Sequence, residues 1–138
     1  LDRHWPSEQF YSYIRSKGPS YNPRELYNRL KEIIKIVNPD FDYNGITINK
    51  NCEAKPHKDG NNMGNGIIVG VGDYTGGDLC VLDEESKTIY VNDLKYNFLE
   101  FNGGKHLHWN TPILSGTKYT IIWFNNQICN KSNLFLNK

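Results

Sequence analysis

The spacing of apolar residues changes near Asp42, and this change constrains the fold more than any other feature of the sequence. From there to about residue 125, apolar and polar residues alternate with a period of two, as in strands that bury one face. The candidate strands are 43–50, 53–57, 66–72, 78–82, 87–91, 97–101, 105–109 and 117–125. Turn residues separate them, at 61–66, 74–77, 83–86 and 103–104.

Helical signals precede the strands. Residues 6–17 form a candidate short helix, and a stronger one is expected over 23–38. Asn22 suits the cap position and Pro23 the first helical position, while Glu25 stands where a capping-box acid belongs. Apolar residues then recur at three- and four-residue spacing until Pro39 ends the pattern.

Helices followed by about eight short strands indicate a mainly β fold with N-terminal helices. We expect a double-stranded β-helix, or jelly roll, with the helices packed on one sheet. At 138 residues the chain is long enough for one domain with a real core. We expect helical support over 1–40, a jelly-roll core over 41–126 and a tail over 127–138. Because the chain opens at Leu1 without Met, we expect a trimmed chain or a piece of a larger one.

Composition narrows the setting. The net charge of +1 gives no broad electrostatic case for nucleic acid and none against a local basic groove. The three cysteines, Cys52, Cys80 and Cys129, are odd in number and form no C-x-x-C pair, which disfavours a zinc ribbon or a disulfide framework. No apolar run approaches the roughly 20 residues of a membrane span. We therefore expect an intracellular protein (cytoplasmic or nuclear) without a membrane partner.

The triplet His57-Lys58-Asp59 is the first candidate for chemistry. On a strand, residues two apart face the same way, so an imidazole and a carboxylate would converge. A distant histidine would complete a two-His, one-carboxylate triad, which suits non-haem Fe(II). His106 and His108 are both candidates, and their pattern alone does not choose between them. A histidine on a strand is more often a half-buried structural residue than a metal ligand, so this interpretation stays open for each of them.

A longer motif follows His108. The run His-Trp-Asn-Thr-Pro-Ile-Leu-Ser-Gly-Thr-Lys-Tyr-Thr places Lys118 ten residues after His108, with Thr120 two further on. Together with H-x-D, this resembles the Fe(II)/2-oxoglutarate-dependent dioxygenases, in which a basic residue at this offset grips the far carboxylate of 2-oxoglutarate. From His106 the same offset reaches Gly116, so the resemblance selects His108.

The resemblance implies a dioxygenase that uses Fe(II), the cosubstrate 2-oxoglutarate and O2. It implies that His57, Asp59 and His108 are the metal-binding and catalytic residues, and that Lys118 and Thr120 bind the cosubstrate. The family usually has Arg where this chain has Lys118; Lys occurs notably in prolyl hydroxylases, and an ammonium cannot form the bidentate fork of a guanidinium. Polar residues on the strand before the dyad, Asn49 and Asn51, are expected at the ketoacid end, with Asn49 preferred.

The loop after the dyad bears on the substrate. Asn61-Asn62-Met63 and Asn65-Gly66 resemble the TET and JBP enzymes, which oxidise methyl groups of DNA bases, and Asn62 matches the asparagine that contacts the flipped base. The implied partner is DNA, with 5-methylcytosine or thymine as target. Against DNA as the partner, the chain lacks the Cys-rich region of animal TET proteins and has little length for a DNA-binding surface; a compact viral, phage or microbial relative would still fit the resemblance.

Two alternatives stay open. A protein hydroxylase of the prolyl type, acting on a protein or peptide, is supported by Lys118 and by a G-G-x-L turn at Gly76-Gly77-Asp78-Leu79. A non-catalytic jelly-roll binding module is the other. For Asn62 itself, a turn residue is an equally good interpretation.

Overall fold

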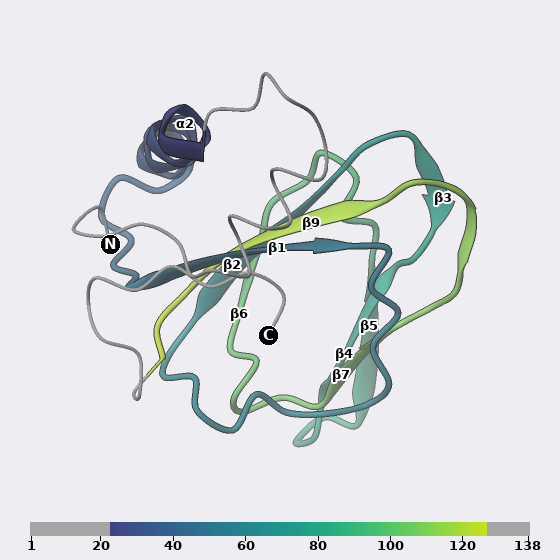
Figure 1. Ribbon diagram of the computed structural model, residues 1–138. Helices are drawn as coiled ribbons and strands as arrows, with labels where there is room; N and C mark the ends of the chain where they lie inside the picture. The colour runs from purple at the N-terminus through teal and green to yellow at the C-terminus, as the bar shows by residue number, and fades with distance from the viewer. Residues whose placement is uncertain (1–22, 127–138) are drawn as a thin grey trace.

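The computed structural model describes residues 23–126, and these form one helix and nine strands (Figure 1). The helix α2 spans Pro23–Val37. The strands are β1 (Gly45–Lys50), β2 (Gly66–Val71), β3 (Tyr74–Gly76), β4 (Leu79–Asp83), β5 (Thr88–Asn92), β6 (Leu99–Phe101), β7 (His108–Asn110), β8 (Ile113–Gly116) and β9 (Tyr119–Phe124). The sequence-based expectation of a mainly β chain is confirmed.

The strands form two antiparallel sheets and a short two-stranded ribbon. The larger sheet has the order β1-β9-β2-β6, the smaller has β5-β4-β7, and β3 pairs with β8. Neighbours in these sheets are distant in sequence; β1, for example, pairs with β9 from Gly45 opposite Phe124 to Lys50 opposite Tyr119. The first and last strands of the β region therefore lie side by side in the larger sheet.

Helix α2 covers the outer face of the larger sheet (Figure 1). Its buried residues Tyr27, Leu30 and Ile34 pack with apolar side chains of β1, β2 and β9 around Trp123, which is fully buried. The indole Nε1–H of Trp123 donates to the carbonyl of Leu30 at 3.3 Å, and so joins the sheet to the helix. Among residues 23–126, no helix has the length and apolar character needed to cross a membrane.

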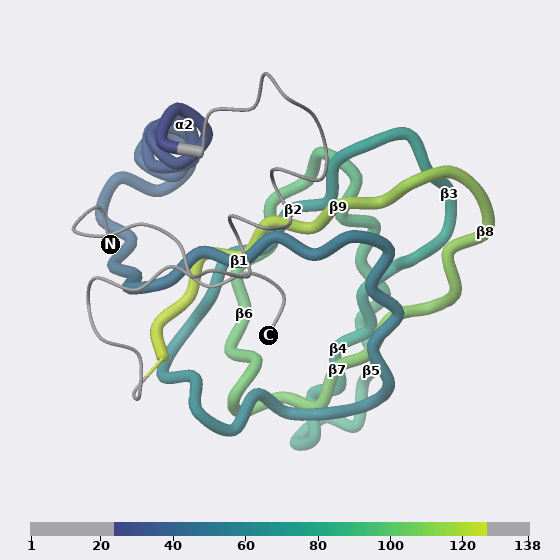
Figure 2. Tube along the Cα trace, viewed as in Figure 1, coloured from purple at the N-terminus to yellow at the C-terminus, as the bar shows by residue number. Residues whose placement is uncertain are grey.

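The opposite face of the larger sheet is turned toward the smaller sheet. There Ile68 packs in a second apolar cluster with Leu79, Val81 and Leu94, partly against residues of β4 in the smaller sheet. The connection between β1 and β2, residues 51–65, passes from the larger sheet to the smaller one and back (Figure 2). This connection contains the H-x-D triplet.

The structure corrects several expected boundaries. The expected strand 53–57 is wrong: only His57 makes a β-bridge, with His108, because the chain turns at Asn51 (φ 52°) and meets β7 at isolated points. The expected strand 105–109 begins only at His108, because Asn102 holds the preceding residues in a turn. The expected turn at 74–77 contains β3, and β8 was not expected at all. The candidate helix 6–17, the tail 127–138 and Cys129 lie outside the described residues.

Candidate metal centre and its cavity

The H-x-D triplet is fixed to β7 by backbone hydrogen bonds. The amide N–H of His57 donates to the carbonyl of His108, and the amide of His108 donates to the carbonyl of His57, both at 3.0 Å. The amide of Asp59 donates to the carbonyl of Gly103 at 2.9 Å, on the turn that precedes β7. Residues about fifty apart in sequence are thereby held face to face.

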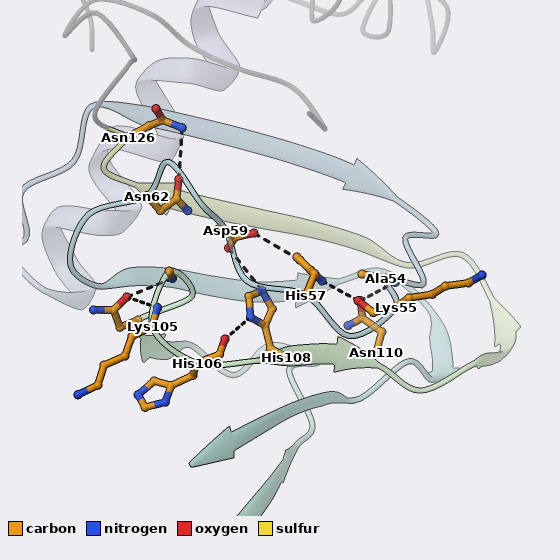
Figure 3. A network of polar contacts seen from close by, with 12 residues as sticks. Ala54, Lys55, His57, Asp59, Asn62, Lys105, His106, His108, Asn110 and Asn126 are labelled. Atoms are coloured by element: carbon orange, nitrogen blue, oxygen red, sulfur yellow. Dashed lines mark hydrogen bonds and ion pairs between the residues drawn. The ribbon is translucent and has the colours of Figure 1, made fainter. Parts of the chain in front are cut away.

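The three side chains converge on one point (Figure 3). Asp59 Oδ1 lies 3.3 Å from His57 Nε2, and Asp59 Oδ2 lies 3.4 Å from His108 Nε2. The three ligand atoms that these residues can offer are all within 4.8 Å of one another. The two imidazole rings are 4.3 Å apart between centroids and tilted by 53°.

Both imidazoles are oriented by backbone carbonyls. Nδ1 of His57 lies 2.6 Å from the carbonyl oxygen of Lys55, and Nδ1 of His108 lies 2.9 Å from that of His106. If each Nδ1 carries the proton and donates it to the carbonyl, each Nε2 keeps its lone pair for a metal. Burial lowers the pKa of His108, but the hydrogen bonds to Asp59 and to the His106 carbonyl outweigh it and leave the pKa raised. The proton that this raised pKa favours lies on Nε2 beside Asp59, and a cation bound between these residues would replace it.

His106 is not part of this cluster. Its carbonyl supports His108, whereas its ring lies apart from Asp59 (Figure 3). It borders a second hollow, lined also by Asp83, Tyr90 and Glu100, outside the metal cluster.

The triad borders a cavity of about 420 Å³, a size typical of small-ligand sites. Alternate residues of β9 and its flanks form one wall of this cavity: Lys118, Thr120, Ile122, Phe124 and Asn126. Their even spacing follows from the period of two, which sends every second side chain inward. From Lys118 to Asn126 this wall runs about 26 Å, at about 3.3 Å per residue.

Lys118 lies at one end of that wall and is only 1% exposed. Its ammonium donates to the carbonyl of Gly77 at 2.5 Å and lies 5.8 Å from the centre of the Tyr74 ring. Burial lowers the pKa of Lys118, while nearby acidic groups, Cys52 foremost, oppose the shift. No ion pair to this ammonium occurs within residues 23–126, so a buried positive charge faces a ligand-sized space. Such a charge suits an anionic ligand.

Thr120 is two residues after Lys118, at the start of the same cavity wall, and Asn49 is its partner on the neighbouring strand. The two residues are directly opposite each other on β9 and β1, and both line the cavity. Asn51 has a different place: its side-chain oxygen accepts from the amide of Lys118 at 2.8 Å, and it does not line the cavity. Asn51 therefore secures the start of β9 instead of facing a ligand.

Asn62 lies toward the other end of the cavity. Its Oδ1 accepts from Nδ2 of Asn126 at 3.3 Å (Figure 3), and the backbone nearby is held by the Met63 amide, which donates to the carbonyl of Asn125 at 2.9 Å. Among the described residues, none accepts from Nδ2 of Asn62. Its amide group is thus fixed as a donor at the cavity wall.

Sequence reasoning missed several residues of the wall. Phe124 and Asn126 continue the inward alternation that begins at Lys118 and Thr120, so the period of two on β9 was a usable signal. Asn110 is two residues after His108 on β7, and the same rule places it on the same face. Phe101 meets the His108 ring edge-on at 5.1 Å, and no local sequence signal points to that contact.

The donor set fits Fe(II). Two imidazole nitrogens and one carboxylate converge beside a cavity, and this donor set is the one that holds iron in non-haem Fe(II) oxygenases. A structural zinc site would instead be closed by four protein ligands, and residues 23–126 bring no fourth His, Cys, Asp or Glu into this cluster.

Comparisons with known proteins identify the fold. No protein-family model matches the sequence, and no curated protein matches it. Among solved structures, the chain is similar to a 2OG-Fe(II) oxygenase family oxidoreductase from Burkholderia pseudomallei, with a TM-score of 0.51 and 16% identity over 62% of this chain and 44% of that one. It is also similar to NgTET1 in complex with 5mC DNA, with a TM-score of 0.48 and 17% identity over 66% of this chain and 37% of that one. The first likeness shows the jelly-roll fold of the 2OG-Fe(II) oxygenases. The chain matches less than half the length of either protein.

Proposed function

We propose that this chain is an Fe(II)- and 2-oxoglutarate-dependent dioxygenase. One observation carries the proposal: a His-Asp-His cluster and a buried lysine ammonium border the same cavity, on a fold that 2OG-Fe(II) oxygenases share. Either feature alone also occurs in proteins with quite different functions. Together they match a ligand that chelates a metal at one end and bears a carboxylate at the other.

Each residue then has a defined task. His57, Asp59 and His108 would hold Fe(II), and the bound iron with O2 and 2-oxoglutarate supplies the oxidation of a C–H bond. Lys118 pairs with the far carboxylate of 2-oxoglutarate, and Thr120 and Asn49 offer hydrogen bonds nearby. Because Lys118 is buried, its charge is weakly screened and the pair is strong.

For the substrate we propose a methylated nucleobase in DNA, 5-methylcytosine or thymine. The fixed amide donor of Asn62 supports this choice, since it can bond an acceptor on a base edge. Two aromatic residues, Phe101 and Phe124, also line the cavity and suit an aromatic ligand. To enter, the base would have to leave the helical stack, at a cost of a few kcal/mol.

The test is turnover with Fe(II), ascorbate and 2-oxoglutarate on methylated duplex DNA and, separately, on a Pro-rich peptide. We expect succinate together with oxidised base, measured by mass spectrometry of the digested DNA. Oxidised peptide without oxidised base would reject the nucleobase and favour a protein hydroxylase. No succinate with either substrate, together with no metal-dependent binding of 2-oxoglutarate, would reject the dioxygenase and leave a binding module.

A pair of neighbouring asparagines sharpens the substrate test. Asn62→Ala removes the fixed donor, so we expect oxidation of DNA to fall at least tenfold while 2-oxoglutarate affinity stays the same. Asn61→Ala is the matched control, because Asn61 also borders the cavity but is exposed and makes no described side-chain hydrogen bond. Equal loss in both variants would contradict the role given to Asn62.

A further inference from the structure

Asn110 contacts the segment before His57 with both its backbone and its side chain. On β7 it follows His108 by two residues, and both line the cavity. Its backbone N–H donates to the carbonyl of Ala54 at 2.9 Å, and its side-chain Oδ1 accepts from the amide of Ala54 at 3.0 Å (Figure 3). This two-point contact secures the segment that leads to His57. It also gives the side-chain oxygen a partner, so the NH2 end of the amide is the end that faces the cavity without one among the described residues.

The free end is a donor. With Oδ1 held by Ala54, the NH2 group of Asn110 is left for the cavity, and none of the described residues accepts from it. The NH2 group is thus the end of this amide that has no partner among the described residues, and its complement is a hydrogen-bond acceptor such as a carboxylate or carbonyl oxygen.

The strand register places Asn110 between the metal cluster and the buried cation. Along β4 and the turn before it, Val81 pairs with His108, Leu79 pairs with Asn110, and the Gly77 carbonyl accepts from Lys118. These three positions are two residues apart, so they follow one another along one side of the cavity. Asn62 and Asn126 lie at the far end of β9, away from Lys118. Asn110 thus belongs to the end that holds Lys118.

We propose that Asn110 is a positioning residue that donates a hydrogen bond to the 2-oxo acid cosubstrate, on the stretch between its metal-binding end and the carboxylate at Lys118. This inference rests on the proposed function. In this proposal the cosubstrate has a charged anchor at each end, the metal site and Lys118, and Asn110 adds a neutral hydrogen-bond donor between them. A fixed donor also favours one orientation of the bound 2-oxo acid, which is the usual benefit of preorganised groups.

Two variants separate the donor from the strut. Asn110→Asp keeps an oxygen for the Ala54 amide and removes the NH2 donor, whereas Asn110→Ala removes both. Affinities for Mn(II) alone, and for N-oxalylglycine in the presence of Mn(II), are measured by titration calorimetry on the full chain. We expect both variants to bind N-oxalylglycine at least tenfold more weakly. Only Asn110→Ala should also lose Mn(II) affinity.

The control for added charge is Asn61→Asp, which places a carboxylate at the same cavity beyond the triad. We expect it to bind N-oxalylglycine within threefold of the parent. Parent-like N-oxalylglycine affinity in Asn110→Asp would overturn the donor role and leave Asn110 as a strut. Weaker binding of methylated DNA, with unchanged N-oxalylglycine affinity, would assign the donor to the substrate and also overturn the proposal. If the parent chain itself fails to bind N-oxalylglycine with Mn(II), the proposed function fails as well.

Discussion

Replacing Lys118 by Met should weaken cosubstrate binding strongly while the stability of the fold changes little. A lysine with a purely structural role would not give this result. Met has nearly the same length and fills the buried site without a charge. Lys118 is 1% exposed, and burial lowers its pKa, so its charged form is destabilised by the loss of hydration. Removing it relieves a desolvation penalty that is several kcal/mol for a buried ion.

The opposing cost is smaller. The carbonyl of Gly77 loses its donor, which costs about 1–3 kcal/mol for a buried acceptor, and the contact with the Tyr74 ring is lost as well. We therefore expect the free energy of unfolding of Lys118→Met to stay within about 2 kcal/mol of the parent, or to rise. Urea unfolding followed by tryptophan fluorescence measures this directly.

Cosubstrate binding should change far more. Truncating one partner of a buried charge pair costs about 2–5 kcal/mol, which corresponds to a loss of roughly thirtyfold to several thousandfold in affinity. Titration of 2-oxoglutarate into the Mn(II)-loaded chain gives that number. A Lys118→Met chain that is destabilised by more than about 3 kcal/mol, or that binds 2-oxoglutarate within threefold of the parent, would refute the reasoning.

Three further results are expected. A Cβ at Gly103 would lie 2.5 Å from Asp59 Oδ2 and 3.2 Å from His108 Cε1, so Gly103→Ala should weaken Mn(II) binding by about 10- to 100-fold, while Gly60→Ala, whose Cβ would meet nothing within 4 Å, should not. Because burial lowers the pKa of Lys118 from the ordinary 10.5, cosubstrate affinity should be full below that lowered pKa and decline as the pH rises through it; Lys118→Arg should move the decline upward, as titrations across the alkaline range would show. Asn126→Ala releases the oxygen of Asn62, so DNA oxidation should fall about tenfold with unchanged 2-oxoglutarate affinity, and equal loss of both would contradict this.

Apolar patterning and turn residues predicted most of the strands, although β1 and β2 prove to be buried on both faces and not on one. Helix 23–38 was also predicted to within one residue of its end. β3 and β8 escaped prediction because they are short and pair mainly with each other, and the glycines at positions 76 and 116, both with positive φ, read as turns. Segment 53–57 was predicted as a strand, although it contacts β7 only through the bridge of His57 and the hydrogen bonds of Ala54 with Asn110. Local alternation does not distinguish such separate contacts from a continuous ladder.

The candidate site was likewise predictable in part from the sequence. Spacing and resemblance nominated residues at 57, 59, 108 and 118, and the structure brings all four to one cavity. Strand alternation did not choose between His106 and His108, because both lie near β7 and only the bridge to His57 shows which ring faces Asp59. The amide orientations of Asn62 and Asn110 were beyond the sequence, since each depends on a partner more than fifty residues away.

The central claim is that three side chains form a metal site beside a 2-oxo acid pocket, and a titration of Mn(II) followed by 2-oxoglutarate tests it most directly. His108→Ala removes one proposed ligand, and His106→Ala is the matched control two residues away. We expect the parent chain and His106→Ala to bind one Mn(II) and then one 2-oxoglutarate, and His108→Ala to lose both. Equal Mn(II) affinity in the parent and His108→Ala would contradict the claim, as would an affinity for 2-oxoglutarate that is the same with and without Mn(II).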